Sequence, residues 1–144
     1  MMVSGAGSAL QLSMYGVDEY IVQYENELGL PWKSREPWLK VSYPFFQADR
    51  IKTPTLFMGG TSDFNVPLVA GEQMYEALQI LHVPSALIVY PQQFHGFTRP
   101  TYIRDRYQYW FNWYDKWVLG KNVKLTYLPW AKKEAKKEAK KKTE

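Results

Sequence analysis

Residues 53–60, Thr-Pro-Thr-Leu-Phe-Met-Gly-Gly, and residues 84–90, Pro-Ser-Ala-Leu-Ile-Val-Tyr, decide the fold class. Each contains a short, continuously apolar run, which is typical of a strand buried on both faces of a sheet. Between the two runs, residues 67–81 carry apolar side chains at helical spacing, and a second helical pattern begins at Pro100. This order of strand, helix, strand and helix predicts an α/β fold in which the strands 53–58 and 86–90 are parallel.

The remaining segments fit around this unit. Residues 1–8 predict a short strand that runs into a glycine loop, and residues 17–28 predict a helix that Gly29 can end. Residues 31–44 interleave prolines with tryptophans and predict an ordered loop with a short helix, because the aromatic side chains of this segment need burial. The helix from Pro100 to Gly120 is expected to pack one face on the sheet, formed by Ile103, Tyr107, Trp110, Tyr114 and Trp117.

Length and composition narrow the class of protein. The 144 residues, 46% of them hydrophobic, suffice for one domain with a core. There is no cysteine, which excludes disulfides, thiolate zinc sites and cysteine nucleophiles, and the two histidines are too far apart in sequence to suggest a metal site. With no visible signal peptide and no apolar run of about 18 residues, the sequence predicts no membrane association and favours a cytoplasmic location.

The net charge of +4 is located entirely at one end of the sequence. Residues 131–144 contain seven lysines and three glutamates, whereas residues 1–130 contain 11 basic and 11 acidic side chains. The basic isoelectric point therefore does not indicate a nucleic-acid-binding domain. We expect the Lys-rich tail to be a solvated extension, and attachment to an acidic partner is the alternative.

Two loops that leave the predicted strands carry the candidate chemistry. Functional side chains of parallel α/β sheets gather where the strands end, which here are residues 59–67, with Asp63, and residues 91–97, with His95. We therefore expect the carboxylate of Asp63 and the imidazole of His95 to lie within hydrogen-bond reach or close to it. A carboxylate beside an imidazole fixes the tautomer of the ring and stabilises the imidazolium. The alternative is a turn residue at Asp63 and a surface histidine at His95. His82, at a helix end that favours positive φ, is interpreted as structural.

Five motifs follow one another along the sequence. They are residues 3–7 (Val-Ser-Gly-Ala-Gly), 48–54 (Ala-Asp-Arg-Ile-Lys-Thr-Pro), 60–67 (Gly-Thr-Ser-Asp-Phe-Asn-Val-Pro), 72–78 (Glu-Gln-Met-Tyr-Glu-Ala-Leu), and Tyr90-Pro91 followed by His95-Gly96-Phe97. In this order they resemble the prolyl oligopeptidase family, especially its acylaminoacyl-peptidase-like branch. The likeness spans residues 3 to about 119. It implies the C-terminal portion of an α/β-hydrolase fold, with Asp63 as the triad acid and His95 as the base.

The sequence departs from the family at the nucleophile. None of the seven serines lies in a G-x-S-x-G elbow, and Ser8, which comes nearest in context, is flanked by Ala6 and Leu10. The resemblance therefore implies that residues 1–120 are a C-terminal piece of a catalytic domain, followed by an extension over residues 121–144. The elbow, the oxyanion donors and a β-propeller would belong to an N-terminal segment that precedes Met1.

Two hypotheses follow from this resemblance. In the first, the protein is a serine-type peptidase that acts on short or N-acylated peptides, and the isolated chain is inactive because it lacks the serine. This hypothesis implies no cofactor and no metal. In the second, it is a truncated or degenerate hydrolase half-domain that acts only by assembly with a partner chain. Either form can self-associate as a homo-oligomer, because a missing neighbouring strand leaves an open apolar edge.

Overall fold

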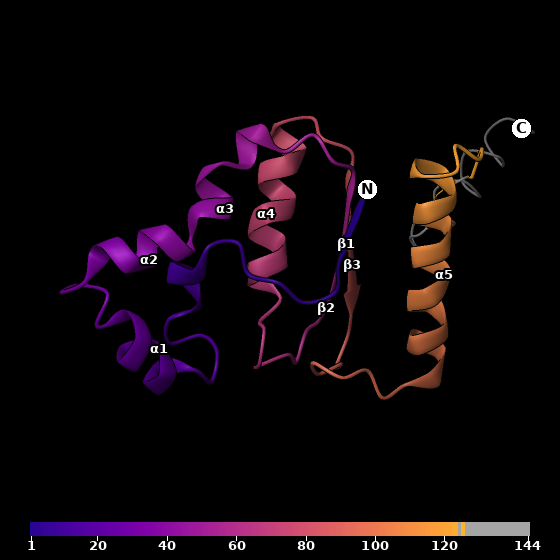
Figure 1. The fold of residues 1–144 in the computed structure, drawn as a ribbon. Coiled ribbons are helices and arrows are strands. Elements are labelled where there is room, and N and C mark those ends of the chain that lie inside the picture. The colour runs from indigo at the N-terminus through magenta and orange to yellow at the C-terminus, as the bar shows by residue number, and fades with distance from the viewer. Residues whose placement is uncertain (124, 126–144) are drawn as a thin grey trace, which may run out of the picture. The chain divides into compact units, whose positions relative to one another are not determined.

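The structure is a computed structural model that describes residues 1–123 and 125 of the chain (Figure 1). Its elements are β1 (Met2–Ser4), a 3₁₀ helix (Gln11–Met14), α1 (Ile21–Leu28), α2 (Arg35–Val41), α3 (Tyr43–Phe46), a second 3₁₀ helix (Ala48–Arg50), β2 (Thr55–Gly60), α4 (Val69–Ile80), β3 (Ser85–Tyr90) and α5 (Pro100–Trp117). The chain divides into two compact units, and the second begins at Asp105. The predicted domain boundary at residue 120 stays a prediction, and the Lys-rich tail lies outside the described residues.

The first unit is built on a three-stranded parallel sheet in the order β1-β2-β3. Gly60 at the end of β2 is in register with Tyr90 at the end of β3, so the loops that leave the two strands start side by side. All six residues of β2 are buried, as expected of the central strand of a covered sheet. The predicted pair of parallel strands is confirmed, and β2 extends through both glycines at its carboxyl end.

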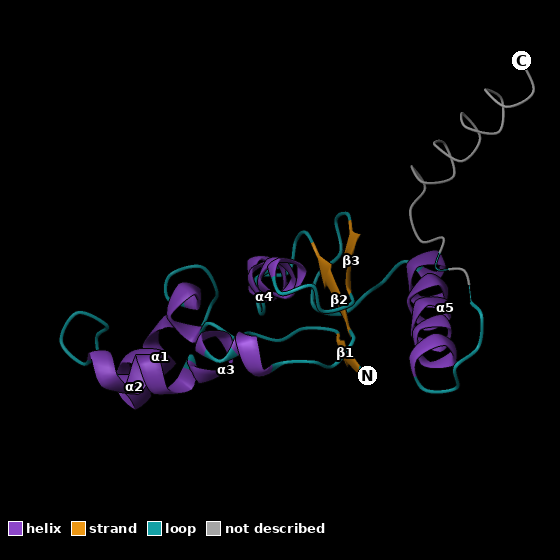
Figure 2. Cartoon of the chain, turned by 90° about the horizontal axis from the view of Figure 1, so that it is seen from above, coloured by secondary structure: helices purple, strands orange, loops and turns teal. Residues whose placement is uncertain are grey.

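Helix α4 lies along one face of this sheet (Figures 1 and 2). Its buried side chains, Ala70, Met74 and Leu78, lie at the helical spacing predicted for residues 67–81, whereas Leu81, beyond the end of the helix, is exposed. Met74 and Leu78 share a core cluster with Phe57 of β2. The helix ends at Ile80, and His82 follows with a φ of 55°, which agrees with its interpretation as a structural residue at a helix end.

The region between β1 and β2 folds into α1, α2 and α3. Helix α1 begins at Ile21 instead of residue 17, because Asp18 accepts a hydrogen bond from the Tyr20 amide and forms a turn there. Gly29 ends the helix with a φ of 77°, as predicted. Trp38 is fully buried and donates its Nε1–H to the Gly29 carbonyl at 2.8 Å, whereas Trp32 is 70% exposed. The expected burial of the tryptophans in this segment is therefore wrong for Trp32.

Helix α5 begins at Pro100 as predicted, but the predicted phase of its apolar face is wrong. Tyr107 and Tyr114 are exposed, and the one fully buried side chain among the described residues of this helix is Trp113. Trp113 lies one turn from Trp110 and from Trp117, whose ring it contacts. The less exposed face is therefore rotated by one residue, about 100° around the helix axis. No helix in the described part of the chain is long and apolar enough to span a membrane.

Candidate active site

Asp63 lies in the turn that follows β2 and is 7% exposed. Its amide donates to the Gly60 carbonyl at 3.3 Å, and its Oδ1 accepts hydrogen bonds from the amides of Asn65 at 3.0 Å and Val66 at 2.8 Å. The side chain thus organises its own turn, as the structural alternative for an Asp in this loop predicts. These bonds use Oδ1 and fix the direction of the other oxygen, Oδ2.

His95 lies in the loop that follows β3, and its Nδ1 is 3.1 Å from Oδ2 of Asp63. The predicted contact between the two side chains is therefore formed. The side chain of Asp63 is 4% exposed and the side chain of His95 is 47% exposed. The acid is therefore buried, and the imidazole is open to solvent. Asp63 serves both as a turn residue and as the partner of the histidine, and the two interpretations of this residue are compatible.

This geometry determines what the imidazole can do. An ionised carboxylate only accepts hydrogen bonds, so the contact favours the tautomer of His95 that carries its proton on Nδ1. Nε2 then keeps its lone pair and can take a proton from a neighbouring hydroxyl. In general, a carboxylate beside an imidazole also stabilises the imidazolium that such a transfer forms. The pair has the arrangement of a general base and the acid that orients it.

Three hydrogen bonds tie the loop of His95 to the turn of Asp63. The amide of Thr61 donates to the carbonyl of Tyr90 at 3.1 Å, and its Oγ1 accepts from the amide of Gln92 at 2.8 Å. The amide of Ser62 donates to the carbonyl of Gln93 at 3.0 Å. Both loops therefore form one hydrogen-bonded body at the carboxyl edge of the sheet.

A cavity of about 210 Å³ adjoins the turn of Asp63 and was not predicted from the sequence. Its lining includes Asn65, whose Oδ1 accepts a hydrogen bond from the hydroxyl of Tyr20, and Tyr24, whose hydroxyl donates to Asp18. Burial, followed by the hydrogen bond to Asp18, raises the pKa of Tyr24, so this hydroxyl stays protonated at neutral pH. The sequence pattern gave no sign that residues 18–24 lie beside the turn formed by residues 63–66.

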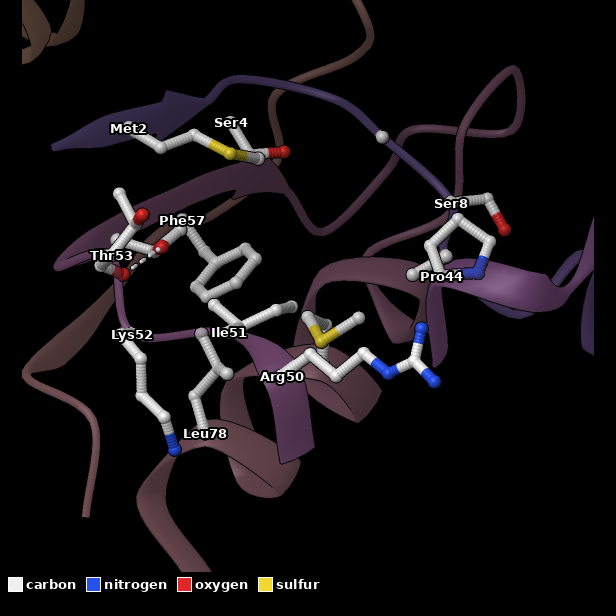
Figure 3. Close-up of a pocket in the computed structure, with 14 residues that line it drawn as sticks. Met2, Ser4, Ser8, Pro44, Arg50, Ile51, Lys52, Thr53, Phe57 and Leu78 are labelled. Carbon is white, nitrogen blue, oxygen red and sulfur yellow. Dashed lines mark hydrogen bonds between the residues drawn. The ribbon is translucent and has the colours of Figure 1, made fainter. Parts of the chain in front are cut away.

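Ser8 lines two cavities. One is the cavity beside the turn of Asp63, and the other is a cavity of about 530 Å³ that Met2, Phe57 and Leu78 also line (Figure 3). None of the residues lining the second cavity comes from the two loops. The Oγ of Ser8 has no hydrogen-bond partner among the described residues. Within the same part of the chain, no group of three or more acidic or histidine side chains could hold a metal ion.

Residues 1–121 match the profile described as the prolyl oligopeptidase family. The chain is 35% identical over 63 residues to dipeptidyl aminopeptidase BIII of Pseudoxanthomonas mexicana. The aligned residues cover 44% of this chain and 9% of that enzyme. It is 36% identical over 76 residues to the acylamino-acid-releasing enzyme of Arabidopsis thaliana. Here the aligned residues cover 51% of this chain and 10% of that enzyme. The chain thus spans about a tenth of the length of these relatives.

Solved structures share the fold. Acylaminoacyl peptidase of Pyrococcus horikoshii superposes with a TM-score of 0.73 at 21% identity, over 81% of this chain and 20% of that one. A puromycin-hydrolyzing peptidase of Mycobacterium tuberculosis superposes with a TM-score of 0.71 at 23% identity, over 81% of this chain and 18% of that one. The fold is therefore a portion of the α/β-hydrolase fold, as predicted, and the chain belongs to the prolyl oligopeptidase family.

Proposed function

We propose that Asp63 and His95 are the acid and the base of a serine-peptidase triad that hydrolyses short or N-acylated peptides by acyl transfer. The contact of 3.1 Å between Nδ1 and Oδ2 carries this proposal. In such a triad Nε2 takes the proton of the serine hydroxyl as the serine attacks the peptide carbonyl. The same nitrogen then returns the proton to the leaving amine.

The nucleophile of this triad would come from residues outside the 144 of this chain. None of the seven serines lies in a G-x-S-x-G elbow, and the hydrogen-bonding partner of His95 is the acid. An exposed imidazole at the edge of the sheet is open to a serine supplied from another segment. The oxyanion donors and the contacts that select the peptide would be supplied with it.

A chimera tests this proposal. Residues 1–121 replace the matching segment of a family member that keeps its own elbow serine, and labelling by a serine-directed phosphonate and peptide hydrolysis are measured. We expect labelling of the chimera, and we expect His95→Ala to lower turnover by a factor on the order of 10⁴ to 10⁶. His82→Ala is the matched control and should leave labelling unchanged, because His82 lies outside the site.

The outcomes separate the two functions. A chimera that folds but is not labelled would favour a half-domain that acts by assembly alone. The cavity of about 530 Å³ beside β1 and β2 is consistent with that alternative, because its apolar lining could be covered by another segment. Labelling of the 144-residue chain by itself, abolished by Ser8→Ala, would place the nucleophile at Ser8 and contradict both proposals.

A further inference from the structure

Gln93 is a buried amide in a loop whose other polar residues are open to solvent. It is 2% exposed, while its neighbours Gln92 and Phe94, and also His95, are exposed. Burying an amide without hydrogen bonds costs about 1–3 kcal/mol, so such side chains are retained where they have partners. The partners of Gln93 therefore indicate what the burial achieves.

The side chain of Gln93 closes the loop that carries His95. Its Oε1 accepts hydrogen bonds from the amides of Thr98 at 3.0 Å and Arg99 at 3.3 Å, and its Nε2 donates to the carbonyl of Gln92 at 3.1 Å. In the chain, residues 94–97, which include His95, lie between Gln93, whose Oε1 accepts two of these bonds, and Thr98, the first residue that donates one. One side chain thus bridges the two ends of this segment by hydrogen bonds to its backbone.

The main chain of Gln93 holds the same loop to the turn of the acid. Its carbonyl accepts the amide hydrogen bond of Ser62, the residue directly before Asp63. The approach is close, because a Cβ placed on Gly60 would lie 2.1 Å from that carbonyl oxygen. Gln93 therefore contacts the loop of the base through its side chain and the turn of the acid through its backbone.

We propose that Gln93 is a positioning residue that sets the contact between His95 and Asp63, by closing one loop and binding it to the other. An effect of Gln93 on catalysis rests on the proposed function, whereas its effect on the contact between His95 and Asp63 does not. Without the bonds of the Gln93 side chain, the two ends of residues 94–97 are no longer held together. The imidazole of His95 is then no longer held in one position against Oδ2 of Asp63. The hydrogen bonds of the amide itself go to backbone atoms of its own loop and not to the imidazole.

The test uses nuclear magnetic resonance of the ¹⁵N-labelled 144-residue chain, which reports the tautomer of each imidazole. The sequence has two histidines, so His82 is an internal reference for His95. We expect the wild-type His95 to carry its proton on Nδ1. Gln93→Met keeps the length of the side chain but loses all three bonds, and we expect His95 to lose its fixed tautomer in this variant. Gln93→Glu keeps an oxygen acceptor for the amides of Thr98 and Arg99, so in this variant His95 should keep its proton on Nδ1.

A structural role alone would give a different pattern. The tautomer of His82 and the thermal midpoint show whether each variant is folded, and Gln93→Asn, one methylene shorter, replaces the Met variant if that one does not fold. A fixed Nδ1–H tautomer in every folded variant, or both tautomers in the wild type, would overturn the proposal. Unfolding of Gln93→Glu together with Gln93→Met would assign the residue to general stability and overturn it as well.

The active chimera gives a second, kinetic measurement. There Gln93→Met should lower kcat by about 10²-fold, the cost of a misplaced catalytic group, with KM nearly unchanged, and Gln93→Glu should recover most of the loss. Equal kcat in Gln93→Met and in the parent chimera would also overturn the proposal. If the parent chimera is inactive, the proposed function fails, while the tautomer measurement still decides the role of Gln93.

Discussion

Gly60, the last residue of β2, has no space for a side chain. A Cβ at this position would lie 2.1 Å from the carbonyl oxygen of Gln93 and 2.6 Å from its carbonyl carbon, and backbone atoms cannot move aside as a flexible side chain can. We expect Gly60→Ala to separate the two loops and to destabilise the protein by at least the 1–3 kcal/mol that is typical of overpacking. Chemical denaturation measures this loss.

Gly71 provides the matched control for this substitution. It lies within α4, and a Cβ there would meet no atom within 4 Å. Gly71→Ala should therefore leave stability unchanged or raise it by up to about 1 kcal/mol, because alanine is the better helix former. Equal effects of the two substitutions would contradict the close approach of Gly60 and Gln93.

The two residues of the candidate pair were accessible from the sequence, but the residue that positions them was not. Asp63 and His95 each follow a predicted strand, and parallel strands bring such positions to one edge. Gln93 gives no comparable signal, since a glutamine beside another glutamine in a loop looks like a solvated residue. Its burial depends on the distances between two loops, which the order of residues does not contain.

Helix α5 illustrates what hydrophobic periodicity can and cannot predict for an element. The helix was predictable from Pro100 at its first turn and from Gly120 beyond its end, which takes a φ of 64°. Its buried face was not, because aromatic side chains occur on every side: Tyr102, Tyr107, Tyr109, Trp110, Phe111, Trp113, Tyr114 and Trp117. In β2, by contrast, a continuous apolar run needs no choice of face, and the prediction was correct.

The corrected phase of α5 leads to a stability prediction. Trp113 is 2% exposed and Tyr114 is 48% exposed, although the two are adjacent in sequence. Trp113→Ala should cost about 3–5 kcal/mol, as is typical of removing a buried aromatic side chain. Tyr114→Ala should change stability by no more than about 0.5 kcal/mol apart from a small gain in helix propensity, because alanine is the better helix former. Urea denaturation compares the two, and a larger loss for Tyr114→Ala would restore the original phase.

The whole molecule combines a neutral part with a basic end. Residues 1–130 carry 11 basic and 11 acidic side chains, and residues 131–144 carry seven lysines and three glutamates. Long-range attraction to a polyanion scales with net charge and is screened over about 10 Å at 0.1 M salt. Any such attraction should therefore come from residues 131–144 and not from the α/β-hydrolase fold that carries Asp63 and His95.

Heparin chromatography checks this division of charge. The full chain should be retained at low salt and eluted as the salt concentration rises, whereas a chain that ends at residue 130 should pass through the column. Glutamine in place of Lys132, Lys133, Lys136 and Lys137 leaves three lysines against three glutamates, so this full-length control should also pass through. Both variants should keep the thermal midpoint of the parent, since residues 131–144 contain no apolar side chain larger than alanine. Retention of the chain that ends at residue 130 would instead place a basic cluster on the folded part, and the neutral sum of its charges would then conceal a local binding surface.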